Sequence, residues 1–395
     1  MKHFSLNFIL VLMLVTLFVN TLLPAGASAK AAASKTDPGR LSPAAGLCVN
    51  KAQLLYQKGQ IQEAITLLDK CIRQPENTSE KPHYYLYFLL GNYYALLEDK
   101  TAQKKAILSY QNALKIHPAF GEGWLNLARC FYETQQYKDA ALAFEKGYEY
   151  CKPEKGVHLY YAAVCYFQSG NSEKALALFN TLLKVHPEDV TLAEKEILIN
   201  ILFSLEQYKT ALPYIEELAH KIPYPENKKW QEILLHQYLH LEMDKKALAY
   251  AIELTRTDTL EPKWWKGLSH IHLKNDDRKK GLAALIIYGF LTPMSQDELE
   301  LAADLYFSLD APQSAADYYL AALKHNQTPQ TLEKLAQAFA MAHDTDNAVK
   351  WIDTHLETRP VDEKDRQRQA RLRKLRQQLV QMQAFFAKAS PVLQP

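Results

Sequence analysis

The sequence predicts an all-α fold: a superhelical solenoid of about nine helix–turn–helix repeats, closed by a C-terminal helix. The first observation is a small residue that recurs with a period of about 34 residues. The second is a large apolar residue four positions after almost every small one, often with a proline further on. The recurring small residues are Ala64, Ala106, Ala140, Ala175, Ala211, Ala247, Gly281, Ala315 and Ala348.

Residues 121–154 show how one repeat is built. An apolar stripe with i, i+3, i+4, i+7 spacing predicts its first helix and consists of Trp124, Leu127, Ala128 and Phe131. Residues 135–138 form the turn, Ala140 and Phe144 lie on the second helix, and Pro153 ends it. Ala128 and Ala140 are small because two antiparallel helices approach closely at these positions.

Position by position, this unit resembles the tetratricopeptide repeat, W-x2-L-G-x2-Y, then A-x3-F-x2-A, then P. The resemblance covers residues 45–362 and implies nine repeats. Their first residues are Ala45, Tyr84, Gly121, Gly156, Leu192, Lys228, Pro262, Gln296 and Pro329. In the second repeat we expect three extra residues in the turn between its helices, around 98–104.

The N-terminus predicts export. An apolar run comes after Lys2 and His3, and Ala27-x-Ala29 fits signal-peptidase cleavage before Lys30. Residues 1–29 are therefore predicted to be a signal peptide and 30–44 a disordered leader, which places the protein in the periplasm. The alternative is an uncleaved inner-membrane anchor facing the periplasm, since the run is just long enough to span a bilayer.

Residues 363–389 predict one more helix, and 390–395 a short tail. Its apolar stripe consists of Leu372, Leu375, Leu379, Met382 and Phe386. Its polar face is basic and carries Arg366, Arg368, Arg371, Arg373, Lys374 and Arg376. We expect this amphipathic helix to cap the last repeat, as solenoids require. The alternative is a helix that binds a partner or associates peripherally with a membrane surface.

Composition and motifs argue against several functions. The net charge is only +2, so no global field indicates a nucleic-acid partner. The sequence has no Gly-rich phosphate loop, nucleophile elbow, HExxH or CxxC motif. We therefore expect a protein that is not an enzyme and that needs no cofactor.

The five cysteines divide by repeat position. Cys48 and Cys71 hold positions 4 and 27 of the first repeat. Positions 8 and 20 face each other, so position 4 lies opposite 24, one turn from 27. In an oxidising periplasm this predicts a Cys48–Cys71 disulfide. Cys130 and Cys165 both hold position 10 of successive repeats, point the same way, and are expected to be buried thiols.

The tetratricopeptide resemblance implies a concave groove lined by positions 2, 5, 9, 12 and 13 of each first helix. Here these positions supply Arg129, Tyr132, Tyr160, Phe167, Asn200 and Phe203, then Lys229, Glu232, His236, Leu239, His240, Lys263, Lys266, His270 and Lys274. An aromatic stretch thus runs into a basic one, which suits an extended peptide with apolar and acidic residues. The alternative is ordinary solvated surface.

Two finer interpretations of the groove fail on the residues present. His236 and His240 have the i, i+4 spacing of a chelating pair, but neither cysteine nor carboxylate completes a set with His270, so we expect no metal. Repeats that clamp a C-terminal carboxylate resemble this chain at Asn92 and Asn126. The clamp's charged positions are taken instead by Phe88, Val157 and Tyr161.

One further resemblance rests on residues 264–269, WWKGLS, and on 299–316, LELAADLYFSLDAPQSAA. These segments are similar to exported repeat proteins that accompany the TonB, ExbB and ExbD energy-transduction components. The resemblance implies an accessory scaffold in TonB-dependent transport with TonB-system partners. The alternative is an assembly factor for the cell envelope, a pilus or a secretion machinery.

Overall fold

The computed structural model describes residues 41–73, 82–97, 99–357 and 363–389, and within these ranges every regular element is a helix. The chain divides into two compact units at Thr191 and Leu192. The predicted signal peptide, most of the predicted leader and the predicted tail lie outside the described residues.

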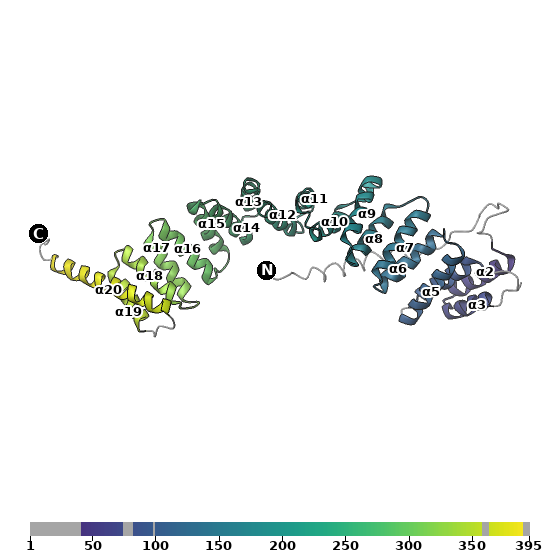
Figure 1. Ribbon diagram of the computed structural model, residues 1–395, viewed down its shortest axis with the longest axis horizontal. Helices are drawn as coiled ribbons and strands as arrows, with labels where there is room; N and C mark the ends of the chain where they lie inside the picture. The colour runs from purple at the N-terminus through teal and green to yellow at the C-terminus, as the bar shows by residue number, and fades with distance from the viewer. Residues whose placement is uncertain (1–40, 74–81, 98, 358–362, 390–395) are drawn as a thin grey trace. The chain divides into compact units, whose positions relative to one another are not determined.

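The first unit consists of four helix pairs (Figure 1). They are α2 (Pro43–Gln57) with α3 (Ile61–Arg73), α4 (Tyr84–Ala95) with α5 (Lys100–Ile116), α6 (Gly121–Glu133) with α7 (Tyr137–Tyr150), and α8 (Gly156–Gln168) with α9 (Ser172–Val185), followed by the short 3-10 helix η2 (Pro187–Asp189). Each helix packs against the next along the chain.

The second unit consists of five helix pairs and one long final helix. The pairs are α10 (Leu192–Ser204) with α11 (Tyr208–Lys221), α12 (Lys228–His240) with α13 (Asp244–Thr257), α14 (Pro262–Lys274) with α15 (Arg278–Leu291), α16 (Gln296–Ser308) with α17 (Pro312–Leu323), and α18 (Pro329–Met341) with α19 (Thr345–Leu356); α20 spans Glu363–Ala389. The fold is thus the predicted all-α tetratricopeptide-type solenoid, and from the second repeat on each predicted start is the first residue of a helix.

The recurring small residues explain why the helix pairs form. Each of them is buried, and a full side chain there would push two helices apart. Gly281 shows the contact most directly: a Cβ on this residue would lie 2.5 Å from Leu273 Cδ2. Opposite it, the hydroxyl of Ser269 donates a 2.8 Å hydrogen bond to the carbonyl oxygen of Gly281. Positions 8 and 20 of a repeat therefore meet as the sequence predicts.

The turn inside most repeats has a common geometry. The residue at repeat position 15 is left-handed in every repeat in which the structure describes it. It is Gly59 and Gly170 in two repeats, but Gln135, Glu206, Glu242, Asp276, Asp310 and His343 in the others. The next N–H then reaches back to a carbonyl of the first helix, as in the 2.8 Å bond from Gln136 N to Phe131 O. This closes the helix end.

One predicted boundary needs correction. The turn of the second repeat does not extend to residue 104, because α5 already begins at Lys100. Asp99 caps this helix early by accepting hydrogen bonds from the N–H groups of Thr101 and Ala102. The first helix begins at Pro43, two residues before the predicted start of the first repeat at Ala45, since Ser42 caps α2 and proline suits its first position.

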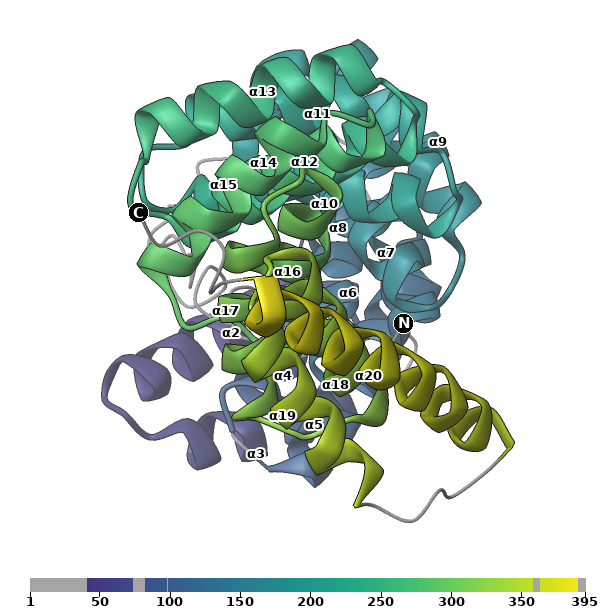
Figure 2. The same ribbon diagram turned by 90° about the vertical axis from the view of Figure 1, so that its left-hand side faces the viewer.

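The final helix α20 covers the last repeat, lying beside α18 and α19 (Figures 1 and 2). Leu372 and Leu379 are buried against Leu335, Phe339 and Ile352 of these helices. The stripe leaves the core toward its end, since Met382 is exposed. The basic face is used in packing, because Arg368 and Arg371 both bind Glu333 and Arg376 binds Asp353. These contacts support the capping interpretation.

The structure contains the Cys48–Cys71 disulfide that the repeat positions predict. It ties the first helix of the first pair to the second. Cys130 and Cys165 are buried free thiols, and Cys151 is a half-buried one. Within the described ranges, no helix combines the length and the apolar content that crossing a bilayer requires.

Candidate functional site

In the first unit, the predicted groove residues are half-buried residues of the first helices, and we call the side of the first helices that carries the predicted groove residues the first-helix face. The ring of Tyr132 packs edge-on against Tyr137 with 5.6 Å between centroids. Tyr160 contacts Tyr161 and packs edge-on against the buried Phe179. Tyr132, Tyr160 and Phe167 are all half-buried. The aromatic stretch therefore supports the packing and also leaves part of each side chain exposed.

Arg129 and Asn126 of this face are also engaged within the protein. Arg129 Nε lies 3.7 Å from the carboxylate of Glu133 one turn on. The amide of Asn126 donates a 2.8 Å hydrogen bond to Asn92 Oδ1, which also accepts one of 2.7 Å from the buried Tyr110 hydroxyl. Thus the two asparagines that match a carboxylate clamp join neighbouring repeats, in agreement with the absence of the clamp's charges.

In the second unit, aromatic residues link three helices. Phe203 of α10 packs against Tyr208 of α11, and Tyr208 packs edge-on against His240 of α12 with centroids 4.7 Å apart. Asn200 of α10 and Leu239 of α12 are half-buried, whereas His236 and His240 are exposed. A partner that reaches this part of the first-helix face would meet rings and an imidazole rather than bare backbone.

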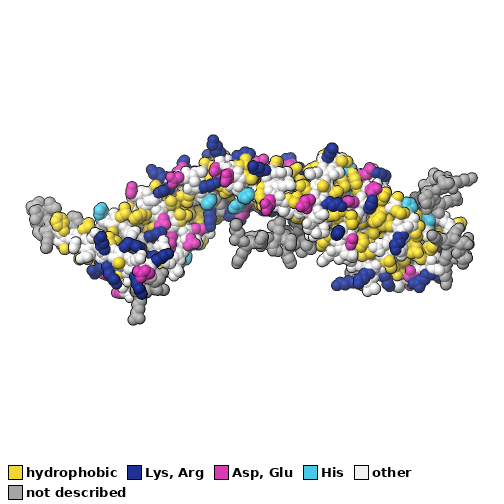
Figure 3. Space-filling view, viewed as in Figure 1, with side chains coloured by type: hydrophobic (Ala, Val, Ile, Leu, Met, Phe, Trp, Pro, Cys, Tyr) yellow, Lys and Arg dark blue, Asp and Glu magenta, His cyan; other side chains and the backbone are white. Residues whose placement is uncertain are grey.

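The predicted basic stretch is not basic in the structure, because each of its lysines has an acidic partner. Successive first helices are joined by a row of ion pairs that we call the charge ladder. Its rungs are Lys229–Glu196 at 2.6 Å, Lys263–Glu232 at 2.7 Å, Lys266–Glu298 at 2.5 Å and Lys334–Asp304 at 2.6 Å. Lys274 is likewise 2.6 Å from Asp244. Figure 3 shows acidic and basic side chains interspersed over α12 to α15.

One rung of the ladder is more buried than the others. The side chain of Glu298 is 13% exposed, although that of Lys266 is 59% exposed. Burial alone would raise the pKa of Glu298, but hydrogen bonds from Lys266, Ser295 and Tyr288 outweigh it and hold the pKa at about 2. The same contact with Glu298 raises the pKa of Lys266. Glu298 therefore stays charged and ties α14 to α16.

The exposed histidines of the first-helix face do not form a metal centre. His236 and His270 are both exposed, and histidine side chains gather over α12 and α14 in Figure 3. Among the described residues, only His186, Glu188 and Asp189 bring three potential ligands together, and they lie at the end of the first unit. Asp189 there accepts a hydrogen bond from Gly156 N, which gives that carboxylate a packing role.

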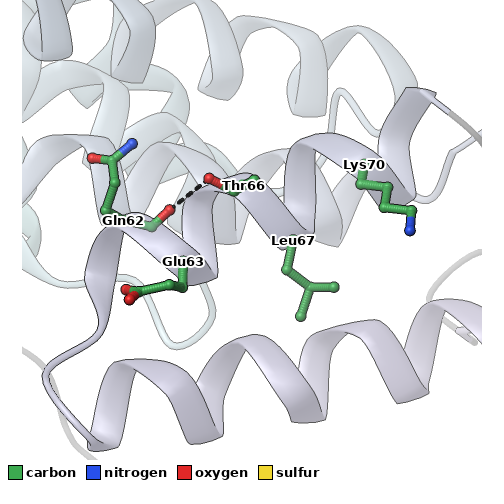
Figure 4. Close-up of a pocket in the computed structure, with 5 residues that line it drawn as sticks. All are labelled: Gln62, Glu63, Thr66, Leu67 and Lys70. Atoms are coloured by element: carbon green, nitrogen blue, oxygen red, sulfur yellow. Dashed lines mark hydrogen bonds between the residues drawn. The ribbon is translucent and has the colours of Figure 1, made fainter.

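A shallow hollow lies on α3, the second helix of the first pair (Figure 4). All of its lining side chains come from this single helix, and Thr66 among them bonds its own backbone at Gln62. It therefore offers no set of groups that converge from different elements, which a specific small-molecule site requires.

The sequence interpretation placed Glu232 in the groove but missed the pairing of the lysines with carboxylates of neighbouring repeats. The signal was available in the repeat register: Glu196 and Glu232 hold position 5 of their repeats, and Lys229 and Lys263 hold position 2 of the next. The paired residues are therefore 33 and 31 positions apart. When each repeat is considered separately, the lysines of one first helix are visible, but the carboxylates that pair with them belong to the neighbouring repeat and are overlooked.

Comparisons with known proteins agree with this fold. Residues 45–78, 104–156 and 159–189 match models of the tetratricopeptide repeat. Among solved structures, the chain is similar to the Naa15/Naa10 complex bound to HypK, at 16% identity and a TM-score of 0.45, covering 84% of this chain and 56% of that one. This chain thus spans little more than half the length of that structure.

Bacterial repeat proteins show the same level of similarity. The C-terminal part of a repeat protein from Cytophaga hutchinsonii is 17% identical with a TM-score of 0.44, over 62% of this chain and 98% of that one. A tetratricopeptide repeat protein from Parabacteroides merdae is 14% identical with a TM-score of 0.36, over 75% and 100%. No curated protein matches the chain significantly.

Proposed function

We propose that this protein is a non-enzymatic periplasmic scaffold that binds protein partners along its first-helix face. The observation that carries the proposal is the stacking of helix pairs, which brings side chains from successive repeats onto one continuous face within each unit. Solenoids of this kind use such extended surfaces to bind other proteins. The half-buried rings of Tyr160 and Phe203 supply rigid apolar anchors of the type that dominates interface energies.

Charge complementarity plays a smaller part than the sequence alone indicates. The lysines of the charge ladder are neutralised within the protein, so an acidic partner would have to compete for them. His236 and His270 are exposed on the same face and can donate or accept hydrogen bonds. We therefore expect a partner segment of mixed polarity, held by apolar anchors and by hydrogen bonds to imidazole.

The test is cross-linked purification of the tagged protein from envelope extracts of its native cells. Phe203→Ala and the double change His236→Ala with His270→Ala should each reduce the partner recovered, with thermal melting checked in parallel. The matched control is Phe290→Ala on α15, a second helix, where the ring is 84% exposed. Unchanged recovery with all first-helix variants, together with loss in the control, would contradict the proposal.

We further propose that the partners are components of TonB-dependent transport, as the resemblance in residues 264–269 and 299–316 implies. Mass analysis of the recovered protein tests export, because cleavage after Ala29 leaves Lys30 as the first residue. Recovery of TonB, ExbB or ExbD with the protein would support this role. Recovery of pilus, polysaccharide or secretion components instead would favour an envelope assembly factor.

A further inference from the structure

The second unit has a pocket between the second helices α11 and α13 and the start of the first helix α12. It has a volume of about 310 Å³ and lies where α11 and α13 end and α12 begins. Its lining consists of Ala219, His220, Tyr224, Asn227, Gln231, Tyr250, Glu253, Leu254, Thr257 and Asp258. Groups from three helices and the loop between α11 and α12 therefore converge on one space.

The pocket contains a buried acceptor without a hydrogen-bond donor. The amide nitrogen of Asn227 donates to the carbonyl oxygen of Ala219 at 3.3 Å. This contact fixes the orientation of the amide, because the reverse orientation would set two oxygens against each other. Asn227 Oδ1 is buried and accepts no hydrogen bond from the described residues. A buried acceptor left in this state costs free energy, which a donor from a ligand would recover.

Three other polar side chains of the pocket, those of His220, Thr257 and Glu253, can also accept hydrogen bonds. His220 Nδ1 lies 2.6 Å from the carbonyl oxygen of Glu216, so that nitrogen carries the proton and Nε2 is left as an acceptor in the neutral ring. The hydroxyl of Thr257 already donates to the carbonyl oxygen of Glu253. The carboxylate of Glu253 accepts only. These groups present oxygen and nitrogen lone pairs to the pocket, beside the amide of Gln231 and the hydroxyls of Tyr224 and Tyr250, which can donate as well as accept.

The charge around the pocket is negative. Lys228 Nζ lies 3.0 Å from a carboxylate oxygen of Asp258 and from one of Glu261. One positive charge therefore faces two negative charges, which leaves this group of three side chains with a net charge of −1. The carboxylate of Glu253 adds a further negative charge. The carboxyl ends of α11 and α13, which carry partial negative charge, both point here against the single amino end of α12.

Two tyrosine rings complete the lining. Tyr250 is buried. The centroid of its ring lies 5.8 Å from that of Tyr238 and 6.1 Å from that of His220. Tyr224 is 62% exposed on the loop before α12. Aromatic faces beside carboxylates attract cations, and a planar guanidinium group stacks on them while its N–H groups remain free to donate.

We propose that this pocket binds the guanidinium group of an arginine side chain presented by a protein partner. The acceptors are spread over Asn227, Glu253 and His220, which suits a flat group with five N–H donors better than a compact ammonium. The pocket shares α12 with the proposed first-helix face, but none of its lining residues belongs to that face, so a partner could hold the scaffold at both places or at either one.

The experiment measures the affinity of the purified full chain for N-acetyl-arginine amide by ligand-observed NMR titration. N-acetyl-citrulline amide, which has nearly the same shape without the charge, and Nα-acetyl-lysine amide are titrated in parallel. The arginine compound should bind most tightly. Equal binding of citrulline would overturn the cation site, and equal binding of lysine would overturn the assignment of a guanidinium.

Variants locate the binding. Asn227→Leu removes the buried acceptor at similar size and should weaken binding about tenfold, the loss expected for one hydrogen bond to a charged group. Glu253→Gln, at an exposed position, should weaken it about threefold. Glu226→Gln lies on the same loop outside the lining and should change nothing. If Asn227→Leu fails to fold, Glu253→Gln against Glu226→Gln decides. Equal affinity in the lining variants and wild type would place the binding elsewhere and overturn the proposal.

Discussion

Lys266 Nζ lies 2.5 Å from Glu298 Oε1 and so joins the first helices of two successive repeats. The two partners differ in exposure, since Glu298 is largely buried while Lys266 reaches solvent. A change at Lys266 therefore leaves a buried carboxylate short of its cation. Reversing its charge, which the sequence alone would treat as a harmless surface change, is expected to disturb the contact between α14 and α16.

We predict that Lys266→Met lowers the free energy of unfolding by about 1–2 kcal/mol, because Glu298 keeps only its neutral hydrogen-bond donors. Lys263→Met removes the neighbouring rung, whose partners are 63% and 41% exposed, and should cost less than about 0.5 kcal/mol. Urea denaturation of the two variants beside wild type measures both values. Equal costs would show that burial of Glu298 does not control the strength of the rung.

The pKa of Glu298 predicts how this contact depends on pH. The folded pKa is about 2, below the ordinary value of 4.5, so the folded state favours the carboxylate. Its contribution to stability is complete above pH 4.5 and is lost as the pH falls toward 2. In Glu298→Gln this contribution is missing at every pH. The difference in melting temperature between wild type and variant should therefore shrink between about pH 5 and pH 2.5, whereas Glu226→Gln should follow wild type throughout.

The fold could be predicted from the sequence because residues within each repeat determine how its two helices pack. Ala140 and Ala175 hold the same position, both are fully buried, and neither position tolerates a larger side chain. The start of α5 was predicted wrongly. The repeat register places the turn at 98–104, whereas Asp99 caps the helix so that it begins at Lys100, and the register alone does not reveal this cap.

The candidate site was only partly predictable. The repeat period predicts which side chains lie on the first helices. It does not show whether a lysine there is neutralised, because that depends on carboxylates of neighbouring repeats, 31 to 33 residues away. The pocket at Asn227 was not anticipated at all. It requires the orientation of one amide and the ends of three helices, which no repeat position encodes.

We predict that the cysteines differ sharply in reactivity. Burial raises the pKa of the Cys130 and Cys165 thiols to about 12, so almost no thiolate forms at neutral pH. Burial also raises the pKa of Cys151, but this residue is half-buried and its thiol can reach solvent. Timed alkylation of the native, non-reduced protein with mass mapping should label Cys151 first and leave Cys48 and Cys71 unlabelled. Early labelling of Cys165 would contradict the buried-thiol assignment.

The same disulfide should contribute to stability. Cys48→Ser combined with Cys71→Ser should lower the stability of the first unit by about 3 kcal/mol, because the unfolded chain regains the freedom of the closed loop. Proteolysis within residues 43–73 under native conditions measures this locally. The matched control, Cys130→Ser, lies in a different repeat and should leave cleavage in that segment unchanged.

The left-handed residue at repeat position 15 gives a final prediction. Gln135 has φ of 60°, which costs a non-glycine residue about 1 kcal/mol, while Gly170 takes φ of 83° freely in the next repeat. Gln135→Gly should therefore raise the free energy of unfolding by up to about 1 kcal/mol, and Gly170→Ala should lower it by about as much. A Cβ at Gly170 would meet no atom within 4 Å, so the cost of Gly170→Ala is conformational rather than steric.

The control is Gln136→Gly, at the next residue of the chain, where φ is −85°. It should destabilise the protein, since glycine there only adds freedom to the unfolded chain. If glycine had the same effect at 135 and 136, the left-handed turn would not determine the stability of these repeats.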